Sequence, residues 1–335
     1  MTDLPIIPER DHRDDGLLGH AMRNVRAAGH VMDTVLGGMG VAGHLVRPML
    51  APADRLAEAW LRRVGDPYLD DILAIRRSLA RPGPVAFSLS YEFGCTARVF
   101  SGAPRVLMRT LDWPFRGLGE LVELVHLSGP AGPWSTATWP GVVGVIQGMA
   151  PGRFAAALNQ APERRTGFGR PIDWLAGKRR FWRAQGLPPT HLLRRVFETC
   201  PDFPSALAML RDAPVAAPGI FTLAGLSDGE AVSIERTENA GHIRRAPSAT
   251  NGFSEAGGSW RARGIDSAGR LAQVEAMDAP PGHTALAPPM LNALTRLAVT
   301  ASADGRLSLT GFDGLTPVTQ TCRHDVSARD SAPGA

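Results

Sequence analysis

The chain is organised around the stretch Tyr91-Glu92-Phe93-Gly94-Cys95-Thr96. In this stretch a cysteine directly follows a glycine at the start of a sequence typical of a β-strand. A cysteine in this setting is typical of core packing, where the thiol acts as a small apolar group. If the Gly94–Cys95 bond is cut, Cys95 instead gains an α-amine with a pKa of about 7.7 to 8.0. That amine can act as the general base for its own thiol, so one residue would supply both nucleophile and base.

The sequence that follows predicts a β-hairpin. Residues 95–100 and 105–109 read as two short strands, and Ser101-Gly102-Ala103-Pro104 between them is turn-forming. The hairpin carries Arg109 and Asp112 back toward Cys95. An Arg-x-x-Asp pair at a strand end is, taken alone, typical of a surface ion pair.

Three later segments extend the pattern. They are Pro140-Gly141-Val142-Val143-Gly144, the run from Pro151-Gly152-Arg153-Phe154 to Leu158-Asn159, and Thr250-Asn251-Gly252. With Cys-Thr, the hairpin and Arg-x-x-Asp, this order resembles the acid ceramidase and N-acylethanolamine acid amidase family. That family is grouped with bile-salt hydrolases and penicillin acylases among the N-terminal-nucleophile hydrolases. The resemblance runs from Tyr91 to about Cys322.

The resemblance implies a role for each of seven residues. Cys95 is the nucleophile, and autocleavage separates Gly94 from it, since Gly94 has no side chain to oppose a strained conformation. Arg109 lies beside the sulfur and favours thiolate. Asp112 orients the new amine, Asn251 donates to the oxyanion, Arg270 supports the nucleophile and Asn159 positions the substrate amide.

The fold expected is α+β, because predicted strands are followed by helices and then by strands again. The resemblance implies a four-layer αββα sandwich with an N-terminal helical pro-segment. Residues 1–94 would form that segment, released by cleavage but still associated. Residues 95–322 would form the hydrolase domain, and residues 323–335 a disordered tail.

Local patterns predict the following elements: helices at 54–63 and 66–79, each opened by an aspartate cap; strands at 85–91, 97–100, 106–111, 121–127, 141–147, 154–159, 219–226, 231–236 and 306–312; helices at 172–185, 191–198, 203–213 and 270–277.

The composition of the chain argues against several classes of function. The 36 basic and 32 acidic residues give a net charge of +4 without a basic block, which argues against nucleic-acid binding. Three widely spaced cysteines indicate neither a disulfide framework nor a metal site. No cofactor and no metal are expected. The start of the chain lacks a secretory pattern, which favours a cytoplasmic, bacterial protein.

Residues 16–50 are rich in apolar side chains, but charged residues and histidines interrupt them. This excludes a transmembrane helix. Two readings remain for the segment: it packs on the core, or it contacts a membrane surface peripherally.

The function expected is hydrolysis of a linear amide (C–N) bond in an N-acyl lipid, such as an N-acylethanolamine or a ceramide-like amide, through an acyl-Cys95 thioester. One alternative is an acyltransferase or acylase of the penicillin or bile-salt type. The other is a non-catalytic membrane-surface binding module that keeps the fold.

Overall fold

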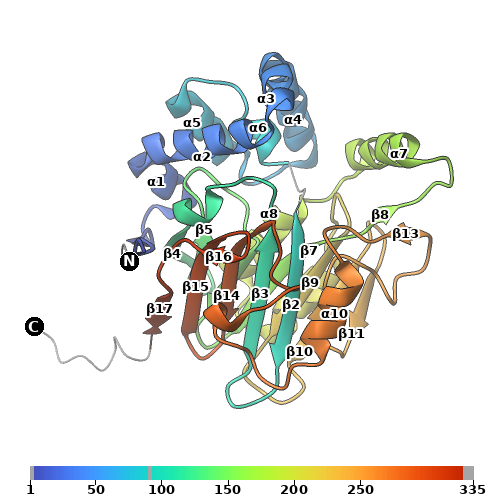
Figure 1. Ribbon diagram of the computed structural model, residues 1–335. Helices are drawn as coiled ribbons and strands as arrows, with labels where there is room; N and C mark the ends of the chain where they lie inside the picture. The colour runs from blue at the N-terminus through green and yellow to red at the C-terminus, as the bar shows by residue number, and fades with distance from the viewer. Residues whose placement is uncertain (1–3, 90–92, 327–335) are drawn as a thin grey trace, which may run out of the picture.

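The computed structural model describes residues 4–89 and 93–326. Figure 1 shows two β-sheets stacked face to face, with helices on their outer sides and a group of N-terminal helices at one end. Both sheets are antiparallel apart from one parallel pair at the start of the chain.

The first sheet, sheet A, has eight strands in the described residues. In spatial order they are β1 (Glu9–Asp11), β4 (Glu123–Gly129), β5 (Gly132–Thr138), β6 (Gln147–Ala150), β7 (Phe154–Gln160), β9 (Gly219–Ala224), β10 (Ala231–Arg236) and β11 (Gly241–Arg244).

The second, sheet B, has seven strands in the part of the chain that is described. They are β12 (Ser248–Ala249), β2 (Gly94–Phe100), β3 (Val106–Asp112), β14 (Thr295–Ala301), β15 (Arg306–Asp313), β16 (Thr316–Pro317) and β17 (Cys322–Asp325), the last two both pairing with β15. A small third sheet joins β8 (Glu163–Arg164) to β13 (Trp260–Arg261).

Helices cover the outer faces of both sheets. Helices α8 (Pro189–Thr199) and α9 (Phe203–Asp212) pack on sheet A, and α10 (Ser267–Glu275) packs on sheet B. A buried apolar cluster that includes Val99, Leu111 and Ala157 fills the space between the sheets. The four layers confirm the predicted α+β architecture of the αββα type.

The N-terminal helices form a separate group above the sandwich in Figure 1. They are α1 (Gly16–Arg23), α2 (Val25–Gly38), α3 (Val41–Val46), α4 (Leu50–Val64), α5 (Leu69–Leu79) and α6 (Pro84–Phe87). Helix α7 (Arg170–Arg183) projects beside them. None of the helices in the described ranges is both long and apolar enough to cross a membrane.

The strand predicted at 85–91 is wrong over residues 85–89, which form α6 and a following turn; residues 90 and 91 lie outside the described residues. The reason is a cap from a distant residue. Asp54 Oδ2 accepts a hydrogen bond from Gly83 N and Oδ1 accepts one from Ala86 N, both at 2.8 Å, and proline favours the first turn of a helix. Asp54 therefore caps α6, while its own helix begins at Leu50.

The predicted cap at Asp66 is also misplaced, because α5 begins at Leu69 and its flanking residue is Tyr68. Asp66 instead accepts from Tyr68 N at 2.9 Å and pairs with His191 at 2.6 Å. Both side chains of the second pair are fully buried, so Asp66 joins the N-terminal helices to α8.

Further regions differ from the prediction. Residues 141–146 form a turn instead of a strand, since Gly141 has φ +85° and Val142 N bonds to Trp139 O at 3.0 Å. Strand β5, which was not predicted, precedes this turn. Strand β17 takes in residues 323–325 of the expected disordered tail, because they pair with β15; residues 327–335 lie outside the description.

Candidate active site

Cys95 lies near the start of β2, and β3 runs antiparallel beside it. The register pairs Gly94 with Asp112 and Cys95 with Leu111, while Arg109 lies opposite Ala97. The predicted hairpin therefore forms and returns Arg109 and Asp112 to the region of the thiol.

The Cys95 thiol contacts a buried guanidinium group. Arg109 Nη2 lies 2.9 Å from Cys95 Sγ and 2.9 Å from Leu158 O. Arg109 Nη1 donates to Gln147 Oε1, so an amide side chain from β6 holds the guanidinium in place. Burial raises the pKa of the Cys95 thiol above its ordinary value, and Arg109 opposes that rise. The buried thiol is therefore neutral near pH 7.

The backbone nitrogen of Cys95 contacts Asn251. Asn251 Oδ1 accepts from Cys95 N at 2.8 Å and from Arg270 Nη2 at 3.0 Å. Its Nδ2 donates to Gln160 O at 2.8 Å. The Asn251 oxygen thus faces the nitrogen that cleavage would turn into an amine.

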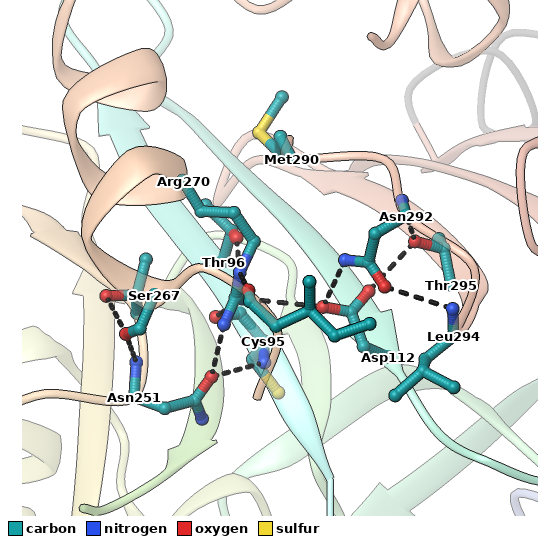
Figure 2. Close-up of polar contacts among 12 residues, drawn as sticks. Cys95, Thr96, Asp112, Asn251, Ser267, Arg270, Met290, Asn292, Leu294 and Thr295 are labelled. Atoms are coloured by element: carbon teal, nitrogen blue, oxygen red, sulfur yellow. Dashed lines mark hydrogen bonds and ion pairs between the residues drawn. The ribbon is translucent and has the colours of Figure 1, made fainter. Parts of the chain in front are cut away.

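Arg270, from α10, connects the two sides of the site, as Figure 2 shows. Its Nη1 donates to Cys95 O at 2.6 Å and to Thr96 Oγ1 at 3.1 Å. The same nitrogen lies 3.4 Å from Asp112 Oδ2. Arg270 is fully buried, so its charge is stabilised by the carbonyl oxygen of Cys95, by Asn251 Oδ1 and by the Asp112 carboxylate.

Asp112 is fixed by two residues that the sequence pattern did not indicate. Asn292 Nδ2 donates to Asp112 Oδ2 at 2.8 Å, and Thr295 Oγ1 donates to Oδ1 at 2.9 Å (Figure 2). Burial raises the pKa of Asp112, while Arg270 and these hydrogen bonds oppose the rise. The signal available was the polar residues Asn292, Thr295 and Arg296 within the otherwise apolar stretch 291–297.

The side chain of Asn159 contacts the backbone at residues 249 and 250 and none of the site side chains described above. Its Nδ2 donates to Ala249 O at 3.0 Å and to Thr250 O at 3.2 Å. Its Oδ1 is buried and has no hydrogen-bond partner within the described residues. Asn159 therefore ties β7 to the segment that carries Asn251.

Two glycines allow the backbones of this region to approach each other closely. A Cβ on Gly94 would lie 3.2 Å from the Asp112 carboxylate and 3.5 Å from Gly264 Cα. Gly264 has φ +73°, and a Cβ there would lie 2.7 Å from Arg270 Nη2. Gly94 is thus enclosed between Asp112 and Gly264.

Two hollows meet at Phe93, two residues before Cys95. One is a cavity of about 240 Å³ with mostly apolar walls, between helices α2 and α5 and the loop at 138–146. The other is a cleft of about 440 Å³ that runs toward α7 and includes Arg164 and Trp174. The Phe93 side chain is buried and lines both hollows.

Solved structures with partial similarity come from three hydrolases or acylases. A Caenorhabditis elegans N-acylethanolamine-hydrolyzing acid amidase ortholog is 18% identical and has a TM-score of 0.45, with 63% of this chain and 93% of that chain covered. A conjugated bile acid hydrolase from Clostridium perfringens is 8% identical and has a TM-score of 0.44, with 70% of this chain and 93% of that chain covered. Penicillin V acylase from Agrobacterium tumefaciens is 14% identical and has a TM-score of 0.43, with 70% of this chain and 86% of that chain covered.

The sequence itself matches acid ceramidase of Balaenoptera acutorostrata scammoni. The two are 30% identical over 103 residues, which is 31% of this chain and 25% of that protein. The matched region thus spans a quarter of the length of this curated relative. The resemblance to acid ceramidase seen in the motifs is confirmed. No family model matches the chain.

Proposed function

We propose that this protein is a self-cleaving cysteine amidase whose nucleophile is Cys95 and whose substrates are N-acyl lipids. One observation carries the proposal: both reactive atoms of Cys95 are already held by suitable partners. The backbone nitrogen lies 2.8 Å from Asn251 Oδ1, and the sulfur lies 2.9 Å from Arg109 Nη2.

Cleavage would use the same atoms. The Cys95 thiol, which burial keeps neutral, loses its proton as the sulfur attacks the Gly94 carbonyl carbon. The C–N bond to Cys95 then breaks, and that same proton goes to the departing nitrogen, which becomes an amine. Water then hydrolyses the Gly94 thioester, which leaves a Gly94 carboxylate and a free Cys95 thiol. Arg109 stabilises the thiolate, and Asn251 Oδ1 accepts an N–H of the new amine.

The mature site would then hydrolyse an amide by the same chemistry. The Cys95 amine takes the thiol proton and returns it to the departing amine of the substrate, and water releases the acyl group from sulfur. We assign Asn251 to holding the Cys95 amine, because its oxygen faces that nitrogen while its Nδ2 is bonded to Gln160 O. Asp112 would keep Arg270 in place behind the nucleophile.

The apolar cavity supports an acyl-chain substrate. Its walls include side chains from α2, α5 and the 138–146 loop, so residues 1–94 would contribute to the mature site. We therefore propose that the N-terminal segment stays bound after cleavage to the domain at 95–322. The buried Asp66–His191 pair, which joins the two parts at 2.6 Å, supports this association.

Exposed apolar side chains near α3 and α4 support peripheral contact with a lipid surface. Leu45, Met49 and Leu56 are 70%, 61% and 59% exposed. Co-sedimentation of the full chain with phosphatidylcholine vesicles tests this contact, and a Leu45→Glu/Met49→Glu variant should sediment less. Equal sedimentation of both proteins would contradict it.

The activity is tested by release of free fatty acid from an N-acylethanolamine and a ceramide, measured by mass spectrometry. Wild type should release fatty acid, Cys95→Ser should release none in the same period, and Arg109→Met should be slowed about 10- to 1000-fold because the thiolate loses its cation. Cleaved wild-type protein that releases fatty acid from neither lipid would overturn the substrate class. When a free amine is added to the reaction, acyl transfer would give a second product, the N-acyl derivative of that amine.

A further inference from the structure

Three side chains that could ligate a metal converge at a place far from Cys95. Glu9, His126 and His324 come from β1, β4 and β17, and one ligand atom of each lies within 4.8 Å of the others. Glu9 Oε1 lies 2.7 Å from His126 Nε2 and 2.8 Å from His324 Nδ1. Among the described residues this is the cluster of histidine and acidic groups that is compact enough to hold an ion.

The sheet topology builds this cluster at one side of the sandwich. β1 is the edge strand of sheet A and pairs with β4, while β17 lies beside β15 toward the edge of sheet B. Strands β15, β14 and β3 lie between β17 and β2. The four strand-to-strand steps from β17 to β2 together span about 19 Å, so the cluster lies far from Cys95. The cluster lines neither of the two hollows that meet at Phe93.

Both histidines are buried, and a second hydrogen bond orients His126. The side chains of His126 and His324 are 3% and 2% exposed, and that of Glu9 is 29% exposed. His126 Nδ1 is hydrogen-bonded to Ser135 Oγ at 2.8 Å, so the ring is oriented with Nε2 toward Glu9. An oxygen partner on the second ring nitrogen is the usual arrangement of a metal-binding histidine. The exposed side at Glu9 leaves room for water as a fourth ligand.

We propose that Glu9, His126 and His324 bind a divalent ion of the zinc class. Two imidazole nitrogens and one carboxylate oxygen form a ligand set that zinc accepts with water in the fourth position. Its role would be structural: Glu9 precedes residue 94 and both histidines follow it, so the ion would link the N-terminal segment to the rest of the protein. This does not depend on the proposed amidase activity.

The proposal reverses the expectation from sequence that no metal site exists. The three ligands are separated by 117 and 198 positions, whereas metal motifs are recognised by short spacings. Only the pairing of β1 with β4, and the return of β17, brings them together.

Metal binding is tested on tag-free, full-length protein that has been treated with a chelator and then titrated with Co²⁺ and Zn²⁺. Wild type should take up about one ion per chain, with the visible absorption of tetrahedral Co²⁺. Glu9→Gln and His324→Gln should each weaken binding at least about 10-fold. His12→Gln is the matched control, because it alters another buried histidine that pairs with a carboxylate, and its binding should equal that of wild type.

Ser135→Ala separates ligation from folding, since it keeps all three ligands and removes only the partner of His126 Nδ1. It should weaken binding about 10- to 100-fold. Wild type that binds no ion more tightly than His324→Gln would overturn the proposal. So would equal binding by folded wild type, Glu9→Gln and His324→Gln.

Discussion

The buried charges around Cys95 do not balance. Two buried guanidinium groups, those of Arg109 and Arg270, surround Cys95, and one buried carboxylate, Asp112, lies beside Arg270. Arg109 is bonded to neutral groups, namely Gln147, Leu158 O and the thiol. A buried cation favours an anionic partner strongly, so a Cys95 thiolate would complete the charge balance of the site.

Gly264 should be indispensable to this arrangement. Gly264→Ala places a Cβ 2.7 Å from Arg270 Nη2 at a residue with φ +73°, so we expect a loss of about 1–3 kcal/mol and a Tm lower by a few degrees. Thermal unfolding followed by circular dichroism measures the change.

Gly257→Ala is the matched control, because a Cβ there meets no atom within 4 Å. It should leave Tm within about 1 °C of wild type. The same Tm for both variants would show that the close approach at Gly264 is unimportant.

Individual site residues were predictable to different degrees. Cys95, Arg109 and Asp112 could be placed together because a short hairpin fixes their relation. Asn251 and Arg270 were found through resemblance, and the structure brings both to Cys95. Gln147, Asn292 and Thr295 were missed, since each acts on the side chain of a residue far away in the sequence. The polar residues in the apolar stretch 291–297 were a signal for the last two, but they did not indicate the partner.

Among the elements, α6 depends on a residue outside itself. It has four residues, Pro84–Phe87, too few to be stable alone. The apolar residues at 85–89 have the pattern of a strand. They form a helix because Asp54 caps it from about thirty positions earlier, which the local sequence does not indicate. Strands β2 and β3 were predicted well because a turn sequence joins neighbours that pair locally.

Asp54→Ala should therefore destabilise the protein although alanine favours the helix that contains it. Two backbone N–H groups, at Gly83 and Ala86, lose their acceptor, which costs about 1–2 kcal/mol. Urea unfolding measures the difference. Asp70→Ala, at an exposed position of α5, is the control and should change stability by less. Equal losses would mean that the α6 cap contributes nothing.

At the scale of the whole molecule, histidine–carboxylate pairs join the N-terminal segment to the sandwich. Glu123 on β4 accepts from His20 Nε2 at 2.6 Å and from Arg10 Nη2 at 3.3 Å. Burial alone would raise the pKa of Glu123, but His20 and Arg10 lower it below its usual value of 4.5. The layers of the sandwich were predictable from the order of strands and helices, whereas such pairs between distant segments were not.

This shift gives stability a pH dependence of known sign. The folded-state pKa of Glu123 lies below its unfolded value, so its contribution is present above about pH 4.5 and is lost as pH falls through the folded-state pKa. Glu123→Gln should have a lower Tm at pH 6 and a smaller fall in Tm between pH 6 and 4 than wild type. Glu120→Gln, at an exposed position, should behave as wild type. Parallel Tm profiles for wild type and Glu123→Gln would contradict this account.

The central claim is that Cys95 becomes an N-terminal nucleophile. The measurement that tests it most directly is the intact mass of purified wild type beside Cys95→Ala after incubation at several pH values. The account predicts two fragments divided between Gly94 and Cys95 in wild type and one uncut chain in Cys95→Ala. A single uncut wild-type chain at every pH, or the same cleavage in Cys95→Ala, would contradict it.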